Sequence, residues 1–261
     1  MARPSPFRAS VTGRVAIVAH RGASAVAPEN TMTAFRLAAE AGADLIELDV
    51  HLTADGEAVV IHDETLERTT NGRGLVGERT LAEIRALDAS RGAGEGVPTL
   101  EEVVAWARTR TLGLALEIKQ PTAALGRAPY ARIADRVAEV IAAHDLVDRA
   151  IVHSFDHPTV LRVRSLLPEV TTAVLYGSGV FVDPVAVARA ADASGLHPRW
   201  SSVTAPLCEA AHAAGLHVHA WGLPEPHDRA VIARLLAAGV DSLSADDPAA
   251  LRLLLALPAA P

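Results

Sequence analysis

The sequence predicts an α/β fold, a TIM (β/α)₈ barrel, and three observations lead to this prediction. Apolar strand-like runs alternate with helical periodicity almost to the end of the chain, which is typical of a parallel sheet covered by helices. No linker or composition shift divides the 261 residues, so we expect a single domain over 1–261. Polar side chains gather where strands end, and barrels of this class carry their active sites there.

Nine runs have the length and composition of strands. They are 15–19, 44–52, 58–62, 112–119, 150–155, 171–176, 199–203, 216–221 and 240–245. The connection between the second and third runs is too short for a parallel crossover and contains Asp55-Gly56. The third run is therefore expected to return antiparallel as a hairpin arm, and the other eight close the barrel.

Helical stretches follow the strand-like runs in turn. They are 31–41, 100–110, 130–143, 158–166, 184–193, 205–214, 228–238 and 248–257. Residues 63–98 break the alternation with a polar loop, a short helix and a Gly-rich stretch. We interpret them as an insertion over one end of the barrel, in the position of a lid.

Composition excludes several classes of protein. Half of the residues are hydrophobic and the formal net charge is −7, so a broad surface for nucleic acid or anionic membranes is not expected. The single cysteine, Cys208, cannot form an internal disulfide framework. No apolar run reaches the roughly 18 residues of a membrane span, and no signal-peptide pattern is present. These features indicate a cytoplasmic protein.

The usage of basic residues singles out one position. Of the 24 basic residues, 23 are arginine, and Lys119 is the only lysine. A lone lysine is ordinarily a solvated surface charge. Because every other basic position uses arginine, we expect that Lys119 supplies a compact ammonium group that a planar guanidinium cannot replace.

Charged side chains on two predicted strands indicate a metal site. In 44–52, Glu47 and Asp49 alternate with apolar residues, and in 112–119 Glu117 shares a face with Lys119. Glu117 and Lys119 also suit a simple structural ion pair. Buried carboxylates need a compensating charge, and an all-oxygen set suits Mg²⁺ or Ca²⁺ better than zinc. We therefore expect Glu47, Asp49 and Glu117 to hold a divalent metal ion.

The hairpin brings an imidazole to the same place. If Asp55-Gly56 forms a two-residue turn, paired positions sum to 111, and His62 stands directly opposite Asp49 with Glu47 one pair away. A slip of one residue would turn His62 to the other face. Two carboxylates and a histidine are thus expected at the mouth of the barrel.

A series of short motifs runs through the chain in a fixed order. The motifs are His20-Arg21-Gly22, Pro28-Glu29-Asn30-Thr31, Glu47-x-Asp49, Thr53-x-Asp55-Gly56, His62-Asp63, Arg68-x-Thr70, Pro98-x-Leu100-Glu101-Glu102, Glu117-Ile118-Lys119, Ser154-Phe155 and Trp221. The spacing of the first histidine-arginine pair, the Glu-x-Asp motif and the second histidine is highly specific, whereas the later motifs are individually weak. Taken in order, these motifs resemble the glycerophosphodiester phosphodiesterase family over about residues 15–250.

The resemblance implies a metal-dependent hydrolase that cuts glycerophosphodiesters to sn-glycerol 3-phosphate and an alcohol. It makes His20 and His62 the general acid and base, and it assigns phosphate binding to Arg21 and Lys119. It supports the metal roles of the three carboxylates. Trp221 is either a surface for the glycerol moiety or a residue that caps the barrel.

Other functions remain open at this point. A Schiff-base aldolase would use Lys119, but imine chemistry needs a lowered amine pKa and Glu117 on the same face would raise it. A non-catalytic phosphate-binding barrel and a lysophospholipase D-type phosphodiesterase are further alternatives. The head-group alcohol, the metal, the acid and base assignment, the choice between cyclic phosphate and direct water attack, and the oligomeric state are not determined by the sequence.

Overall fold

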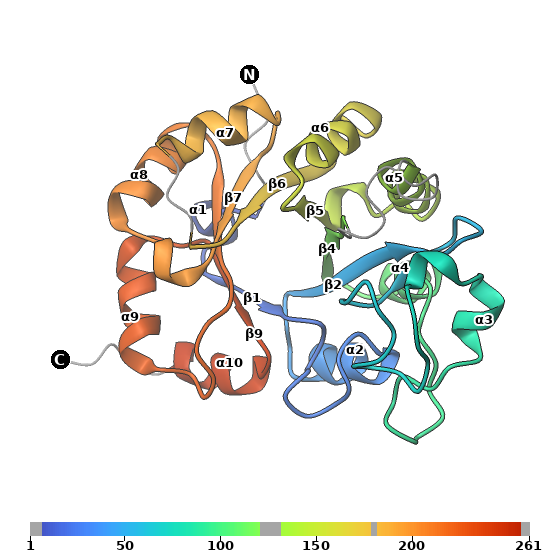
Figure 1. The fold of residues 1–261 in the computed structure, drawn as a ribbon. Helices are drawn as coiled ribbons and strands as arrows, with labels where there is room; N and C mark the ends of the chain where they lie inside the picture. Colours follow the sequence, from blue (N-terminus) through green and yellow to red (C-terminus); the bar gives the residue numbers. More distant parts are fainter. Residues whose placement is uncertain (1–6, 121–131, 179–181, 257–261) are drawn as a thin grey trace.

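The computed structural model describes residues 7–120, 132–178 and 182–256 and forms an eight-stranded parallel barrel. The strands follow the order β1-β9-β8-β7-β6-β5-β4-β2-β3, and a parallel β1–β2 pairing closes the barrel. β3 pairs antiparallel with β2 and lies outside the closed ring. Figure 1 shows the helices arranged around these strands. The predicted fold class, with its hairpin arm, is confirmed.

The strands are short and follow one another at regular intervals. They are β1 (Ala16–Ala19), β2 (Leu45–Leu52), β3 (Ala58–Val60), β4 (Gly113–Ile118), β5 (Ala150–Ser154), β6 (Thr171–Tyr176), β7 (Gly195–Pro198), β8 (His217–Ala220) and β9 (Ser242–Ala245). The α-helices are α1 (Ala9–Thr12), α2 (Met32–Glu40), α3 (Leu81–Arg85), α4 (Leu100–Arg108), α5 (Ile133–Ala143), α6 (His157–Leu166), α7 (Pro184–Ala190), α8 (Ala205–Ala213), α9 (Arg229–Ala238) and α10 (Pro248–Ala256).

Successive side chains along a strand point to opposite faces, so one face of each barrel strand packs in the core and the other lines the barrel axis. On β2, Ile46 and Leu48 join a buried apolar cluster with Phe35 of α2 and Val103 of α4. The intervening residues of β2 point the other way, toward the barrel axis, because side chains alternate along a strand. The layer of apolar residues between strands and helices thus holds the barrel together and leaves its axis available for polar groups.

Side-chain caps begin the outer helices. The Thr99 side chain accepts a hydrogen bond from the backbone N–H of Glu102. The Glu102 side chain accepts one from the backbone N–H of Thr99, which completes a capping box before α4. Asp156 caps α6 in a similar way through the backbone N–H of Thr159. Each cap lies just after a strand or loop, so it determines where the chain turns from the barrel onto its outside.

The seventh barrel strand lies earlier than the sequence predicted. The strand is β7, Gly195–Pro198, whereas the predicted run 199–203 contains a 3₁₀ helix at Trp200–Ser202. The prediction was wrong because β7 contains glycine, histidine and proline and lacks an apolar pattern. Its pairing with β6 and β8 defines it, through partners such as Leu196 and Val218.

The register of the hairpin also differs by one residue from the prediction. Val50 pairs with Val60 and Leu52 with Ala58, so paired positions sum to 110 rather than 111. The turn has three residues, 54–56, because Thr53 N–H donates to Glu57 O and Gly56 takes a left-handed φ of 85°. Asp49 therefore faces the residue before His62.

The insertion has a small core of its own. Leu66, Val76, Ile84 and Val97 pack together with Val59 of β3. This cluster fixes the segment 63–98 against the hairpin arm and contains α3, the expected short helix. Whether the segment acts as a lid stays a prediction.

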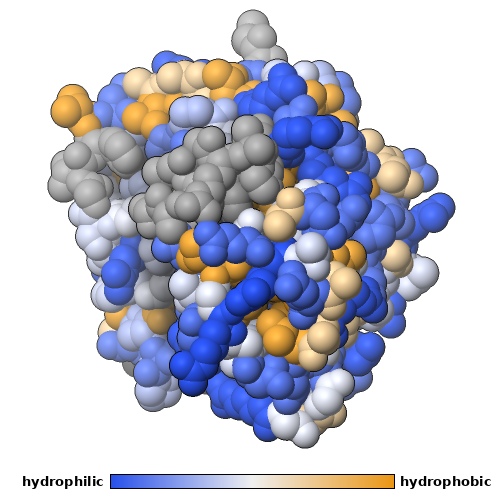
Figure 2. Space-filling view, turned by 45° about the vertical axis from the view of Figure 1, so that its right-hand side comes forward, coloured by the Kyte–Doolittle hydropathy of each residue, from blue (hydrophilic) through white to orange (hydrophobic). Residues whose placement is uncertain are grey.

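Within the described residues, no helix combines the length and apolar character that crossing a membrane would require. On the face drawn in Figure 2, hydrophilic side chains predominate and apolar ones form small separate patches. The cytoplasmic location stays a prediction.

Candidate active site

Three buried carboxylates meet at the open end of the barrel. Glu47 and Asp49 come from β2 and Glu117 from β4, and Asp49 and Glu117 are direct partners in the β2–β4 register. One oxygen atom from each carboxylate lies within 4.8 Å of the other two. The three residues are 3%, 0% and 9% exposed, respectively. The sequence-predicted acidic group is therefore brought together by the fold.

Two cationic side chains contact this acidic group. Lys119 Nζ lies 2.9 Å from Asp49 Oδ1 and donates a 2.5 Å hydrogen bond to Glu117 Oε1. Arg21 Nε lies 3.4 Å from Asp49 Oδ2, and the Arg21 backbone N–H donates to Glu47 Oε2 at 2.9 Å. Arg21 takes a left-handed φ of 56°, a conformation that non-glycine residues rarely adopt outside turns and functional sites.

The balance of charge differs among the three acids. Burial and the neighbouring Asp49 raise the pKa of Glu47 to about 8. Burial also raises the pKa of Glu117 above its ordinary value. Burial alone would raise the pKa of Asp49 too, but the charges of Lys119 and Arg21 hold it well below its usual range.

The residues present fit a hard divalent cation. The three carboxylates outnumber their two cationic neighbours in a buried place, and burial together with the charge of Asp49 makes ionisation of Glu47 costly, which raises its pKa. The donor atoms are all oxygen, which is the set that Mg²⁺ and Ca²⁺ prefer. A divalent ion would offset the excess charge. Which ion binds there stays a prediction.

His20 follows β1, where the chain enters the site. Its Nδ1 lies 2.6 Å from Asp246 Oδ1, and Asp246 follows β9, the strand that pairs with β1. A carboxylate only accepts hydrogen bonds, so Nδ1 carries the proton and Nε2 is left for other partners. Burial would lower the pKa of His20, but the hydrogen bond to Asp246 and the charge of Glu47 raise it overall.

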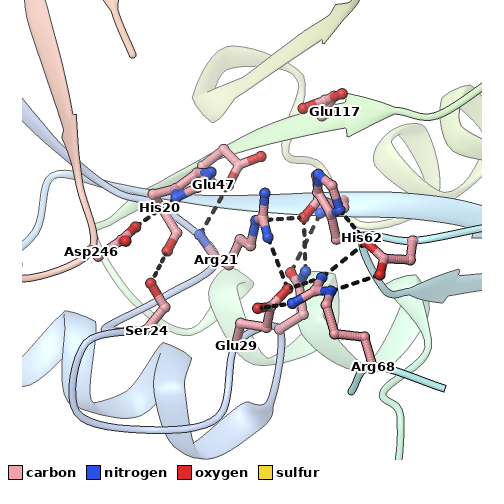
Figure 3. Close-up of polar contacts among 12 residues, drawn as sticks. His20, Arg21, Ser24, Glu29, Glu47, His62, Arg68, Glu117 and Asp246 are labelled. Atoms are coloured by element: carbon pink, nitrogen blue, oxygen red, sulfur yellow. Dashed lines mark hydrogen bonds and ion pairs between the residues drawn. The ribbon is translucent and has the colours of Figure 1, made fainter. Parts of the chain in front are cut away.

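His62 is oriented by a second carboxylate. Its Nδ1 lies 2.6 Å from Asp63 Oδ1, and its backbone oxygen accepts a 3.0 Å bond from His51 Nε2. Because β3 ends at Val60, His62 stands beyond the paired part of the hairpin, and the register error does not remove it from the site. Burial lowers the pKa of His62, although the charge of Asp49 partly opposes this effect. In Figure 3, His20 and His62 flank Arg21.

Glu29 connects the insertion to the site. Its carboxylate accepts a hydrogen bond from Arg21 Nη1 at 2.9 Å and two from Arg68, at 2.6 and 2.8 Å (Figure 3). Arg68 also donates to both oxygens of Asp63. Burial would raise the pKa of Glu29, but these arginines lower it below its ordinary value. Arg68 therefore links the partner of His62 to the partner of Arg21.

Several residues that support the site were not predicted from the sequence. Asp246 supports His20, and Asp63 supports His62. Asn30 donates to Asp49 Oδ2 at 2.8 Å, which holds that carboxylate in place. The available signal was position: Asp246 is an acidic residue directly after the last barrel strand, next to the first.

Trp221 lies at the rim, directly after β8. Its indole N–H donates to the backbone oxygen of His197 at 2.9 Å, and its ring meets Phe155 edge to face at 5.7 Å. Trp221 is partly buried, whereas Phe155 is half exposed. These two contacts hold Trp221 at the mouth of the barrel. Its contact with substrate stays a prediction.

Comparisons with known proteins agree with this geometry. Residues 20–250 match the glycerophosphoryl diester phosphodiesterase family. The glycerophosphodiester phosphodiesterase of Caldanaerobacter subterraneus subsp. tengcongensis is 38% identical over 237 residues, which cover 89% of this chain and 94% of that protein. The glycerophosphodiester phosphodiesterase of Bacillus altitudinis is 36% identical over 240 residues, with 89% and 94% covered.

Solved structures show the same fold. A phosphodiesterase of Oleispira antarctica, determined in complex with the product sn-glycerol-3-phosphate, has a TM-score of 0.82 at 30% identity and covers 92% of this chain and 96% of its own. The glycerophosphodiester phosphodiesterase of Agrobacterium tumefaciens str. C58 has a TM-score of 0.77 at 32% identity, with 93% and 100% covered.

The barrel, its acidic group and these relatives define a phosphoric diester hydrolase. More specifically, the chain belongs to the glycerophosphodiester phosphodiesterase family.

Proposed function

We propose that this enzyme hydrolyses glycerophosphodiesters to sn-glycerol 3-phosphate and an alcohol, with a divalent ion held by Glu47, Asp49 and Glu117. The observation that carries the proposal is the convergence of these three buried carboxylates, within 4.8 Å of one another, beside two carboxylate-oriented histidines. Family membership supports the substrate class.

The contacts of the site residues support the role proposed for each of them. Arg21 and Lys119 would bind the phosphate oxygens, since both present positive charge at the acidic group. When bound, Mg²⁺ or Ca²⁺ would neutralise charge on the non-bridging oxygens of the phosphate. Arg21 and Lys119 are each held in position by ion pairs with two carboxylates.

The histidines would move the protons. His20 and His62 each have Nδ1 committed to a carboxylate, which leaves Nε2 to exchange a proton with the nucleophile or the leaving alcohol. One of the two would accept a proton from the attacking hydroxyl group and the other would give one to the departing oxygen. Either step adds roughly 10²–10⁴-fold to the rate.

Lys119 suits phosphate binding better than imine chemistry. Burial would lower its pKa, but Asp49 and Glu117 raise the pKa to about 12. A Schiff-base lysine must instead be lowered toward neutrality so that the free amine attacks a carbonyl group. The contacts of Lys119 thus weigh against the aldolase alternative.

A substrate screen with and without chelator tests the proposal. We expect the purified enzyme to release sn-glycerol 3-phosphate from glycerophosphocholine or a related diester, EDTA to abolish turnover, and Mg²⁺ or Ca²⁺ to restore it. Lysophosphatidylcholine in the same screen tests the lysophospholipase D alternative. The His20→Ala and His62→Ala variants test the non-catalytic alternative, since that alternative predicts no change in turnover.

Turnover that survives chelation would contradict the roles of Glu47, Asp49 and Glu117. Release of sn-glycerol 3-phosphate from none of the diesters would contradict the proposed substrate class.

A further inference from the structure

Three imidazoles form a hydrogen-bonded chain along the inside of the barrel. His153 Nδ1 lies 2.8 Å from His197 Nδ1, and His197 Nε2 lies 2.8 Å from His217 Nε2. The chain ends where His217 Nδ1 lies 3.0 Å from the backbone oxygen of Ser194. Barrel interiors of this class are usually filled by branched apolar side chains, so this polar chain needs an explanation.

The backbone carbonyl fixes the direction of every bond in the chain. Because a carbonyl oxygen only accepts, His217 donates from Nδ1 and, as a neutral ring, accepts at Nε2. His197 must then donate from Nε2 and accept at Nδ1. His153 must donate from Nδ1, which leaves its Nε2 as an acceptor. Burial lowers the pKa of His153 to about 3 and that of His217 to about 4, which supports neutral rings near pH 7.

Small neighbours make room for this arrangement. On β6, which separates β5 from β7, the partner of His153 is Ala173, whose methyl group lets the two imidazoles meet. On β7, the residue beside His217 is Gly195, and a side chain there would overlap the His217 ring. Small side chains at positions 173 and 195 therefore leave the space that the three imidazoles occupy.

The free end of the hydrogen-bonded chain belongs to a residue that lies beside the acidic group. His153 is 3% exposed, and its Nε2 has no hydrogen-bond partner among the described residues. On β4, its direct partner in the register is the metal-site residue Glu117. The charged groups that act most strongly on its ring are Lys119 and Asp49. A buried acceptor without a donor is costly unless a ligand or water supplies one.

We propose that His153 is a further catalytic-site residue whose Nε2 accepts a hydrogen bond from a hydroxyl group bound beside Glu117, with its acceptor state imposed by His197 and His217. The hydroxyl group belongs either to the glycerol moiety of the substrate or to a water molecule in the site. This inference rests on the proposed function. It gives the two inner histidines a role, which is to hold His153 as a neutral ring with Nε2 as the acceptor.

Two variants of His153 separate the role of the Nε2 acceptor from the role of the hydrogen bond between His153 and His197. In His153→Asn, the amide nitrogen can still donate to His197, but no atom reaches the site. In His153→Gln, the longer side chain places an amide oxygen where Nε2 was. We expect His153→Asn to lower kcat/KM for glycerophosphocholine about tenfold, the value of one hydrogen bond. We expect His153→Gln to recover most of this loss in kcat/KM but to melt below the wild type, because His197 Nδ1 then lacks its donor, whereas His153→Asn should melt near the wild type.

The source of the hydroxyl group is found from the deficit of His153→Asn in affinity for sn-glycerol 3-phosphate and for the analogue of this product that lacks the secondary hydroxyl, a comparison that needs no turnover. If that hydroxyl is the donor, the deficit of His153→Asn disappears on the analogue. If water is the donor, the deficit persists on the analogue. Either result supports the proposal.

A measurement without turnover covers the case in which a variant misfolds. Histidine side-chain ¹⁵N NMR of the wild type should show His153 protonated at Nδ1 only, with an Nε2 resonance that moves when sn-glycerol 3-phosphate is added. A proton on Nε2, or unchanged kcat/KM in folded His153→Asn, would overturn the proposal. Wild-type protein without activity on any glycerophosphodiester would instead overturn the proposed function.

Discussion

His20 and Asp246 lie 226 positions apart in the chain, yet His20 Nδ1 and Asp246 Oδ1 are 2.6 Å apart. The pairing of β1 with β9 produces this contact, since the His20 backbone N–H also bonds to Ala245 O. Closing the barrel therefore assembles one of the two histidine–carboxylate pairs. An incomplete or unclosed barrel would hold the carboxylates of β2 and β4 but not this pair.

Replacing Asp246 should impair catalysis without dismantling the fold. Asp246→Asn removes the charge that raises the pKa of His20. We expect kcat/KM to fall about ten- to a hundredfold, the range for groups that orient a metal-binding histidine. The limb of the pH–rate profile that depends on His20 should move to lower pH, because the imidazolium loses its partner. A pH profile of kcat/KM measures both effects.

Asp247→Asn is the matched control for this prediction. Asp247 caps the next helix through the backbone N–H of Ala250 and has no bond to His20. That variant should lose some stability and keep the wild-type pH profile. Equal pH profiles for Asp246→Asn and the wild type would show that the carboxylate does not tune His20.

Removing one of the crowded carboxylates should stabilise the metal-free protein. Glu47 has a pKa of about 8 in the fold against an ordinary value of 4.5. Between these values the folded chain binds this proton more strongly than the unfolded chain, so wild-type stability falls as pH rises through this window. Glu47→Gln carries no such charge. Above pH 8 in EDTA, we expect it to melt a few degrees higher than the wild type, since about 1 kcal/mol shifts Tm by roughly 2–4 °C at this size.

Added metal should reverse that ranking. Mg²⁺ or Ca²⁺ raises the melting temperature of a protein that binds it in the folded state, so the wild type should gain and Glu47→Gln should gain little. Glu139→Gln, at a half-exposed surface position, serves as the control and should follow the wild type. A wild type whose metal-free stability does not change between pH 5 and 8 would be inconsistent with the charge excess described here.

Gly195 should tolerate no side chain while His217 is present. A Cβ atom at position 195 would overlap the buried ring of His217. We expect Gly195→Ala to cost about 1–3 kcal/mol in the free energy of unfolding, the usual range for overpacking a core. In a His217→Ala background the same substitution should cost much less, which urea denaturation and a double-mutant cycle can measure.

Gly177→Ala is the control for that cycle, because a Cβ atom there would meet no atom within 4 Å. It should leave the free energy of unfolding nearly unchanged. If Gly195→Ala costs equally with and without the His217 ring, the two residues are not matched, and the reason for glycine at this position lies elsewhere.

The two errors of sequence reasoning have local causes. The strand β7 reads Gly-Leu-His-Pro, and neither its apolar content nor its periodicity distinguishes it from a loop. It is a strand because β6 and β8 offer it hydrogen-bond partners on both sides. The hairpin register depended on the turn, and Gly56 allows two- and three-residue loops alike, so the backbone geometry of the turn made the choice.

The sequence by itself determined the barrel and its acidic group, because alternation along a strand is a local property. Glu47 and Asp49 must share a face, and Glu117 must stand at the same end of a parallel neighbour. Only the tertiary structure decided which groups complete the site. Barrel closure brings Asp246 to His20, the packed insertion brings Arg68 to Glu29, and strands far apart in sequence line up the inner histidines. Those contacts join residues whose spacing in the chain carries no signal, so they exist only once the strands have closed around a common axis.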